Sequence, residues 1–341
     1  MKRYLVLAEG HSADPHHGKT MRGFVRYGPH PTVAIVDSDR AGESYEGIPI
    51  VARVNDALCY APTTALIGVA PTGGVLPPVW RALLRACIGN GLDVESGMHA
   101  YLSDDAELSE LARRHGVALL DLRRPPEDIG VPTGENLRLA ARVVHTVGSD
   151  CAIGKKTMAI ELHLEAKKRG RRSVFVPTGQ TGIAISGWGI AVDSVVSDFV
   201  AGAAERLVVQ GAEMGDLLWV EGQGALLHPY YSGVTLGLYH GAMPHLLVLC
   251  HKVGERHIEE LPEHPIPPLA ELVELYERVS LPARRARVVC LALNTANVDE
   301  RGAQAAIAAA EAETGLTADD PVRFGASRLV DAVLERLPEG A

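Results

Sequence analysis

The chain has little of what secreted, membrane-spanning or nucleic-acid-binding proteins need. Its five cysteines are an odd number without a C-x-x-C pair, so neither a disulfide framework nor a zinc knuckle is indicated. No apolar run reaches the roughly 18 residues of a membrane span, and the first run is too short for a signal peptide. The net charge of −9 opposes long-range attraction to nucleic acid or anionic lipid. We therefore expect a cytoplasmic protein that binds neither nucleic acid nor membrane, and a homo-oligomer as the default assembly of such a protein.

A dinucleotide fingerprint is also missing. Asp37 ends the second apolar run, where a ribose-binding carboxylate often lies, but no G-x-G-x-x-G follows the first run. The segment after the first run instead contains Lys19 and Arg22, which are candidate anion contacts in a cleft. Surface basic residues on a solvated turn are the alternative interpretation of the same pattern.

The composition and the order of apolar runs indicate two α/β domains. With 341 residues, 47% apolar and 22% charged, the chain is long enough for two globular cores. Short apolar runs alternate with helical patterns, which is typical of βαβ units and mostly parallel sheets. The predicted strands are 4–8, 32–36, 65–70, 117–121, 143–147, 173–176, 217–220, 245–249 and 287–293. The predicted helices are 77–88, 104–115, 155–169, 197–210, 269–279, 302–313 and 327–337. A charged, proline-rich stretch at 123–132 continues neither pattern, so we predict domains at 1–135 and 136–341.

The most informative motif lies between a predicted strand and a predicted helix. Its residues that we assign to a phosphate-binding loop are Gly148, Ser149, Asp150, Cys151, Gly154, Lys155, Lys156 and Thr157. A glycine-rich turn there directs backbone N–H groups at an anion, and the helix N-terminus and a lysine add positive charge. Five residues rather than four separate the two glycines, and Lys156 stands where a magnesium-binding hydroxyl usually follows the first lysine. The loop is therefore expected to hold a phosphate and to be poorly equipped for magnesium-dependent phosphoryl transfer; an ordinary strand-to-helix turn is the alternative.

Polar residues follow four further predicted strands of the second domain. They include Gln180 and Thr181, Glu221 and His228, His251 and Arg256, and Asn294. Because the carboxyl ends of parallel strands meet at one edge of the sheet, we expect these residues to form one site with the loop. A carboxylate at the position of Glu221 is where phosphate-loop proteins place their magnesium-facing or water-facing acid, and the amide of Asn294 suits an adenine edge. Taken singly, each of these residues could equally be a cap or a turn residue.

These motifs together carry a family resemblance. The loop at 148–157 and the blocks 177–182, 187–193, 198–205 and 220–224 resemble the D-glutamate N-acetyltransferase family. Two shorter matches, Gly18-Lys19-Thr20 and Ser96-Gly97-Met98-His99, fit the N-terminal domain of that family. The resemblance implies an α/β fold with an N-terminal Rossmann-like domain followed by a P-loop NTPase-like domain with a mostly parallel sheet. The second domain is separately similar to dethiobiotin synthetase, from which Lys156 departs.

The resemblance implies acetyl transfer from acetyl-CoA to the amino group of D-glutamate or a similar acidic amino acid. The phosphate loop and Asn294 would then hold the cofactor, with no metal required. A general base must deprotonate the amine; we favour Glu221 or His228 over Asp193 and Asp198, which could instead cap a helix. The residues that we expect to bind the substrate are Lys19, Arg22, Gln180, Thr181, Asp193 and Arg256.

Three alternatives to this mechanism remain open at the level of the sequence. An ATP-dependent kinase or carboxylate-activating ligase that uses magnesium is suggested by the five-residue interval of the loop, by Glu221 and by Asn294. A nucleotide-binding module without chemistry is suggested by the missing hydroxyl after Lys155. Cys151, close to a helix N-terminus and two lysines, could itself carry the acetyl group, or it could simply be a small residue in a tight turn.

Overall fold

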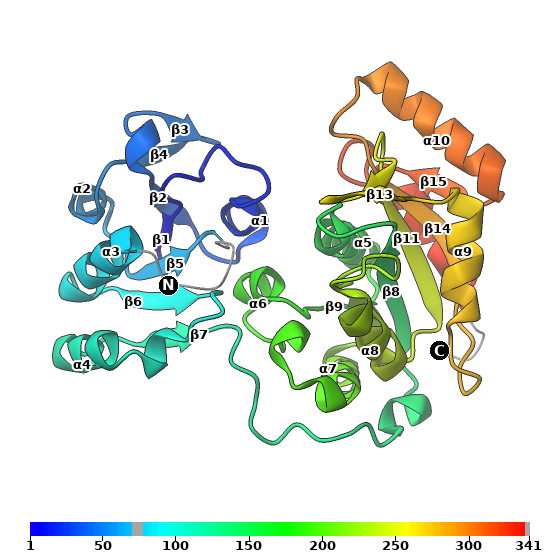
Figure 1. Cartoon of the computed structure of the whole chain (residues 1–341), viewed down its shortest axis with the longest axis horizontal. Coiled ribbons are helices and arrows are strands. Elements are labelled where there is room, and N and C mark those ends of the chain that lie inside the picture. Colours follow the sequence, from blue (N-terminus) through cyan, green and yellow to red (C-terminus); the bar gives the residue numbers. More distant parts are fainter. Residues whose placement is uncertain (70–77, 338–341) are drawn as a thin grey trace. The chain divides into compact units, whose positions relative to one another are not determined.

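The computed structural model describes residues 1–69 and 78–337, which form two compact units (Figure 1). The first unit contains Met1–Pro125 and Gln180–Ser194, and the second contains Pro126–Gly179 and Val195–Ala341. The chain therefore leaves the first unit after Pro125, returns to it at Gln180 and leaves it again after Ser194. We predicted a single boundary after residue 135. The structure places the segment at 126–135 with the second unit, and it packs a later segment of 15 residues, Gln180–Ser194, into the first.

The described residues of the first unit form a seven-stranded sheet. Its strand order is β3-β4-β2-β1-β5-β6-β7, and the pairings are parallel apart from that of β3 with β4. The strands are β1 (Tyr4–Leu7), β2 (Thr32–Val36), β3 (Ser44–Tyr45), β4 (Ile48–Val51), β5 (Thr64–Ile67), β6 (Asp93–Ser96) and β7 (Leu119–Asp121). The helices are α1 (Lys19–Tyr27), α2 (Val54–Ala57), α3 (Pro78–Gly89), α4 (Ala106–His115) and α6 (Gln180–Ser186).

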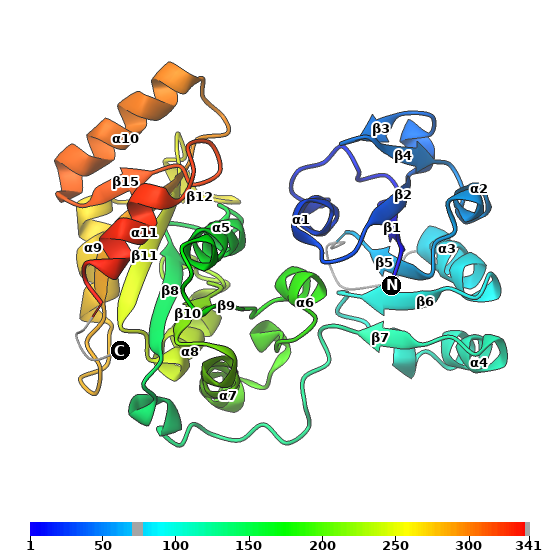
Figure 2. The same cartoon turned by 180° about the vertical axis from the view of Figure 1, so that it is seen from behind.

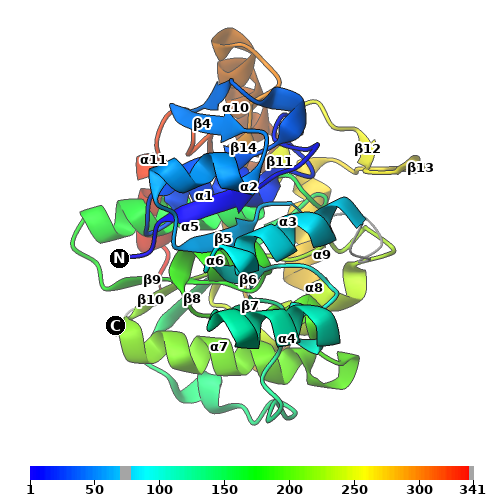
Figure 3. The ribbon, with the colours of Figure 1, turned by 90° about the vertical axis from the view of Figure 1, so that its left-hand side faces the viewer.

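Burial and capping explain the local structure of the first unit. Every residue of β1 and β5 is buried, as expected for central strands of a parallel sheet that is covered on both faces. The helix α4 begins after Asp105, whose carboxylate accepts hydrogen bonds from the backbone N–H groups of Glu107 and Leu108, and it ends at Gly116 in the left-handed region. Figure 3 shows α3 and α4 side by side, where they also contact each other.

The second unit contains a six-stranded sheet in its described part, and every pairing in it is parallel. The strand order is β15-β14-β11-β8-β10-β9. The strands are β8 (Arg142–Gly148), β9 (Ser173–Val176), β10 (Leu217–Val220), β11 (Leu246–Lys252), β14 (Arg287–Asn294) and β15 (Thr317–Asp319), beside a small hairpin of β12 (His257–Ile258) and β13 (Leu261–Pro265). The helices are α5 (Lys155–Lys168), α7 (Val200–Met214), α8 (Ser232–Ala242), α9 (Leu269–Arg278), α10 (Glu300–Thr314) and α11 (Ser327–Leu334).

Two hydrophobic cores, one on each face, hold this second sheet. Successive residues of β11 alternate between them, because successive side chains of a strand point to opposite faces: Val248 packs with α5 and α11, and Leu249 packs with α8, α9 and α10. Figure 2 shows α11 and α5 on the face that it presents. Coverage of both faces is the arrangement in which parallel sheets are found, and it explains the nearly continuous apolar runs of the strands.

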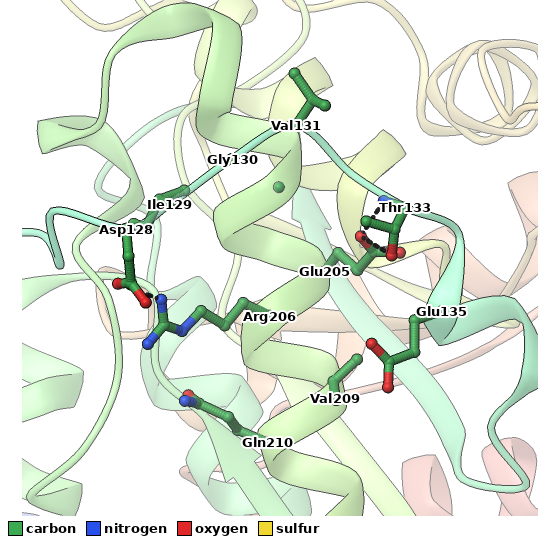
Figure 4. A pocket seen from close by; sticks show the side chains of 11 residues that line it. Asp128, Ile129, Gly130, Val131, Thr133, Glu135, Glu205, Arg206, Val209 and Gln210 are labelled. Atoms are coloured by element: carbon green, nitrogen blue, oxygen red, sulfur yellow. Dashed lines mark hydrogen bonds and ion pairs between the residues drawn. The ribbon is translucent and has the colours of Figure 1, made fainter.

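The segment at 126–135 is anchored on α7 by close backbone and side-chain contacts. A Cβ atom at Gly202 would lie 1.8 Å from the backbone oxygen of Gly130, so the segment packs directly on the helix. The buried carboxylate of Glu205 accepts hydrogen bonds from the backbone N–H and the hydroxyl of Thr133. Beside these contacts lies a hollow of ≈ 210 Å³, whose lining residues come from this segment and α7 (Figure 4). The hollow lies where the segment at 126–135 packs on α7.

Most predicted elements are present with shifts of a few residues at their ends. The bounds predicted for the strands at 32–36, 173–176 and 217–220 are confirmed. The prediction missed, among others, β6, β15, α1, α6 and α8. The predicted end of a strand at Ala70 and the predicted start of a helix at Pro77 lie outside the described residues. Within the part of the chain that the structure describes, no helix is both long and apolar enough to cross a membrane.

Candidate functional site

The phosphate-binding loop joins β8 to α5, between a buried strand and a helix of 14 residues. Gly154 has a φ of 112° and stands directly before the helix, a backbone conformation that favours glycine. The N-cap residue of α5 is thus a glycine, which has no side chain of its own to cap the helix. The first N–H groups of α5 and the helix dipole therefore act on the same small region, which is the arrangement that binds anions.

Lys155 places a buried positive charge in this loop. The residue is 6% exposed, and its Nζ donates a hydrogen bond of 2.6 Å to the backbone oxygen of Asp150. Its stem passes close to two glycines: a Cβ atom at Gly148 would lie 3.1 Å from Lys155 Cδ, and one at Gly222 would lie 3.0 Å from it. The sequence Glu221-Gly222 after β10 therefore lies beside the loop, as predicted.

Side chains from neighbouring segments hold the loop in shape. The buried carboxylate of Asp150 accepts hydrogen bonds from the backbone N–H groups of Cys151 (2.7 Å) and Glu259 (2.6 Å). Ser149 Oγ lies 2.9 Å from Nδ1 of His251, and burial lowers the pKa of this histidine. Asn294, which we predicted to contact adenine, donates to the backbone oxygen of Ile153 (3.0 Å) and accepts from the N–H of Ala296 (3.1 Å). The amide nitrogen thus supports the loop and the amide oxygen holds the turn that follows β14, and contact with adenine stays a prediction.

Glu221 lies at the end of β10 and is fixed by the loop that follows β9. One oxygen of its carboxylate accepts hydrogen bonds from the backbone N–H groups of Thr178 (3.0 Å) and Gly179 (3.3 Å). The residue is only 4% exposed. A Cβ atom at Gly179 would lie 2.5 Å from Nε2 of Gln223, so this glycine allows the two loops to approach. The result is a buried carboxylate with a defined orientation next to Gly222 and Lys155.

His228 is brought to the same loop by the segment between β10 and α8. Ligand atoms of Asp150, Cys151 and His228 all lie within 4.8 Å of one another. The backbone N–H of Tyr230 donates to Nδ1 of His228 at 3.3 Å, so a neutral ring carries its proton on Nε2. The structure therefore places both predicted base candidates beside the phosphate loop, together with the thiol of Cys151.

A second group of titratable side chains lies in the first unit, in the segment that follows β1. Ligand atoms of His11, Asp14 and His17 lie within 4.8 Å of one another. The carboxylate of Asp14 accepts hydrogen bonds from His17 Nδ1 and from the backbone N–H groups of His16 and His17. These bonds lower the pKa of Asp14 to about 2, with the side-chain bond to His17 as the largest cause. A tight local turn accounts for this cluster.

The block at 177–182 is divided between the two units, which corrects the expectation that it lies entirely on the edge of the second sheet. Thr178 and Gly179 contact Glu221, as described above. Gln180 and Thr181 begin α6 and pack in the first unit, because α6 lies against α1: the hydroxyl oxygens of Thr181 and Thr20 are 2.8 Å apart, and both residues are buried. Asp193 also belongs to the first unit.

The predicted cations differ in their surroundings. Lys19 is exposed at the first position of α1. Arg22 donates to the backbone oxygen of Ala13 (2.9 Å) and stacks on the ring of Tyr45, with 5.3 Å between its Cζ and the ring centroid. These contacts give Arg22 a packing role. Arg256 is exposed in the second unit, before β12.

Sequence reasoning missed one buried cation of the first unit, Arg123. It is 2% exposed, its Nη1 donates to Oε1 of Gln180 at 3.1 Å, and its Nη2 lies 2.9 Å from Oδ2 of Asp193. In the sequence, this arginine is the first residue of the charged, proline-rich stretch at 123–132, which predicted only a domain boundary. Its position two residues after a predicted parallel strand was a signal that could have pointed to it, because ligands bind at that end of such strands.

Comparison with known proteins places these observations in a family. Residues 130–330 match the description "Domain of unknown function (DUF1611_C) P-loop domain", and residues 37–125 match "Domain of unknown function (DUF1611_N) Rossmann-like domain". These matches agree with the predicted order of a Rossmann-like domain followed by a P-loop domain.

Two curated relatives share most of the chain. A D-glutamate N-acetyltransferase from Tritonibacter scottomollicae is 39% identical over 277 residues, which is 79% of this chain and 80% of the relative. A D-glutamate N-acetyltransferase from Pseudoalteromonas sp. is 34% identical over 270 residues, covering 78% of this chain and 80% of that protein. Among solved structures, a DUF1611 family protein from Anabaena variabilis matches with a TM-score of 0.94 at 41% identity, covering 98% of this chain and 100% of the other.

Proposed function

The chain belongs to the DUF1611 family, and from that premise we propose that it transfers the acetyl group of acetyl-CoA to the amino group of D-glutamate. The observation that carries this proposal is its similarity, over about 80% of its length, to two relatives that are named for acetyl transfer to D-glutamate. The acetyl donor is the finer part of the proposal. It is supported by the phosphate loop, because coenzyme A carries a pyrophosphate and a 3′-phosphate.

The loop suits a ligand whose phosphates are bound without being transferred. The N-terminus of α5, which follows a glycine, and the buried Lys155 provide positive potential. Lys156 stands where a nucleotide-hydrolysing loop has the hydroxyl that binds magnesium. The loop therefore binds phosphate but lacks a magnesium ligand that phosphoryl transfer needs. The phosphate loop also includes Ser149, Asp150, Cys151, Gly154 and Thr157.

Acetyl transfer requires that the acceptor lose a proton, because only the free amine attacks a thioester. In the proposed mechanism the amine nitrogen bonds to the acetyl carbonyl carbon, the bond from that carbon to sulfur breaks, and coenzyme A leaves as the thiol. The ammonium group of the acceptor first loses one proton to solvent. After attack, Glu221 accepts the second proton from the nitrogen and passes it to the leaving sulfur, which becomes the thiol. His228, whose Nδ1 accepts from Tyr230, donates its Nε2–H to the carbonyl oxygen as negative charge develops there.

The two roles are tested by Glu221→Gln and His228→Gln. Each removes one proton-transfer or hydrogen-bonding function while keeping the approximate size of the side chain, so we expect kcat to fall about 100-fold or more with little change in affinity for acetyl-CoA. His257→Gln, at an exposed histidine of β12, is the control and should keep normal turnover. Normal kcat in both site variants would contradict the assignment of these roles.

A covalent route through Cys151 predicts a different outcome. Its thiol lies near His228, so the acetyl group could first move to the sulfur and then to the amine. We propose direct transfer, and Cys151→Ser should therefore keep near-normal turnover. Loss of turnover in this variant, together with an acetylated wild-type protein in the absence of acceptor, would establish the covalent route.

A further inference from the structure

The carboxyl ends of β6 and β7 form part of one edge of the sheet in the first unit. The two strands pair in parallel, and His99 follows the first of them while Arg123 follows the second. In open parallel sheets, ligands bind at this edge. The segment Gln180–Ser194 packs on it: a Cβ atom at Gly97 would lie 2.7 Å from Cγ of Gln180, and Arg123 contacts both Gln180 and Asp193. At this edge of the sheet, residues that are far apart in the sequence therefore pack against one another.

Arg123 is buried at this edge with unused hydrogen-bonding capacity. Among the described residues, neither its Nε nor its Nη2 has a hydrogen-bond partner, although Nη2 lies 2.9 Å from Oδ2 of Asp193. The contact with Asp193 is thus an ion pair by distance without the alignment of a hydrogen bond. A buried guanidinium whose Nε has no partner and whose Nη2 has only a misaligned ion pair is costly for the folded protein, and a planar carboxylate can accept two parallel N–H bonds from an arginine.

The neighbouring arginine shows what a structural arginine looks like in the same segment. Arg124 donates to Oγ of Ser103 and to the carboxylate of Asp104, and its guanidinium stacks on the ring of Tyr101. Its side chain is 42% exposed, against 3% for Arg123. Among the described residues, Arg123 therefore differs from its neighbour in having two buried guanidinium nitrogens without a hydrogen-bond partner, and it differs from Arg22 and Arg142, in each of which only Nε is buried without one.

Asp193 and His99 supply the remaining charges around Arg123. The side chain of Asp193 is 33% exposed, so the acidic member of the pair is reachable from solvent, while Nε and Nη2 of Arg123 are buried behind it. His99 is exposed as well, and its pKa is lowered by burial of part of the ring and by the positive charge of Arg123, against the opposing effect of Asp193. A fixed cation and a fixed anion at one edge match the carboxylate and the ammonium group of an amino acid.

We infer that Arg123 and Asp193 form the subsite of the amino-acid acceptor, in which Arg123 binds a carboxylate through Nε and Nη2 and Asp193 binds the ammonium group. Gln180 holds the guanidinium from the opposite side through Nη1. This inference rests on the proposed function, since it takes the acceptor to be D-glutamate. It assigns carboxylate binding to Arg123, which is not among the cations predicted from the sequence, Lys19, Arg22 and Arg256.

The test compares Arg123→Lys and Arg123→Met with Arg124→Met as the matched control. Calorimetric titration with D-glutamate, in the presence of coenzyme A, measures binding without turnover, and steady-state kinetics give KM for both substrates. We expect both Arg123 variants to weaken D-glutamate binding about tenfold or more, because a charge-assisted bidentate pair is lost, and KM for acetyl-CoA to change less than twofold. The Arg124 variant should match the wild type. Thermal melting of each variant establishes that it is folded.

The outcomes separate this inference from the proposed function. Unchanged D-glutamate binding in a folded Arg123→Lys protein would overturn the subsite, even if the wild type acetylates D-glutamate. Failure of the wild type to acetylate any amino acid, with D-glutamate binding that Arg123→Lys abolishes, would overturn the function and retain the subsite. D-Glutamine, which lacks the side-chain carboxylate, identifies the group that is bound: if Arg123 binds that carboxylate, wild type and Arg123→Lys should bind D-glutamine equally.

Discussion

Replacing Lys155 by alanine should weaken the binding of acetyl-CoA about 10- to 150-fold. The ammonium group is buried within the phosphate loop, where it is poorly screened by solvent. A hydrogen bond to a charged partner contributes about 1.5–3 kcal/mol, and each 1.4 kcal/mol is about a factor of ten in Kd. The variant also removes the donor to the backbone oxygen of Asp150, so we expect a loss of about 1 kcal/mol in the free energy of unfolding.

The assay is calorimetric titration of acetyl-CoA into the wild type, Lys155→Ala and Lys168→Ala. Lys168 lies in the last turn of the same helix with its side chain 81% exposed, so its removal should not change the affinity. The acetyl thioester of N-acetylcysteamine provides a second control, because it has the reacting group and no phosphate. The Lys155 variant should use this short donor with the same kcat/KM as the wild type.

Two results would refute this reasoning. Equal affinity of the wild type and the Lys155 variant for acetyl-CoA would mean that the loop does not hold the phosphates of the donor. An unchanged KM for acetyl-CoA with a raised KM for D-glutamate would mean that the anion bound by the loop is a carboxylate of the acceptor. The second result would also remove the need for a carboxylate subsite at Arg123.

Two further predictions concern stability. Burial lowers the pKa of His145 to about 3 and that of His163 to about 4, so between pH 6.5 and about 4 the unfolded chain binds protons that the folded chain does not. The free energy of unfolding should therefore decrease as the pH is lowered through this range, by up to about 1.4 kcal/mol per pH unit for each histidine. A urea midpoint that is equal at pH 7 and pH 5 would contradict this. Gly202→Ala should destabilise the second unit by about 1–3 kcal/mol or more, because its Cβ atom would overlap the backbone of Gly130. Gly233→Ala should stabilise α8 by about 0.5–1 kcal/mol, because its Cβ atom meets nothing within 4 Å among the described residues. Equal melting temperatures of the two variants would show that the packing on α7 is looser than described.

The phosphate loop could be predicted from the sequence because its signal is local. A buried strand, two glycines and a helix follow one another between residues 142 and 168, and β8 and α5 begin and end within a few residues of the predicted bounds. The placement of Glu221 beside the loop was also predictable, since both follow parallel strands of one sheet. By contrast, α8 was missed because its sequence contains three glycines, which lower helix propensity, and its stability comes from packing against α7.

The surroundings of Arg123 were not predictable from local pattern. The segment Gln180–Ser194 leaves the second unit to pack on the first, so Gln180 and Asp193 meet an arginine that lies more than fifty residues earlier. Strand β6 was missed as well, because its four residues Asp93–Ser96 include two acids and a serine, which does not look like a buried strand. Without that strand, His99 and Arg123 cannot be placed at one edge of a sheet. Contacts of this kind depend on tertiary packing, which a single sequence does not encode as a pattern.

The most direct test of the account is the release of free thiol from acetyl-CoA by the purified protein, followed with D-glutamate, L-glutamate or no acceptor, each with and without a metal chelator. The account predicts release with D-glutamate, at a rate that the chelator does not change, and formation of N-acetyl-D-glutamate in equal amount. Absence of release with every acceptor, together with turnover of magnesium-ATP, would contradict it.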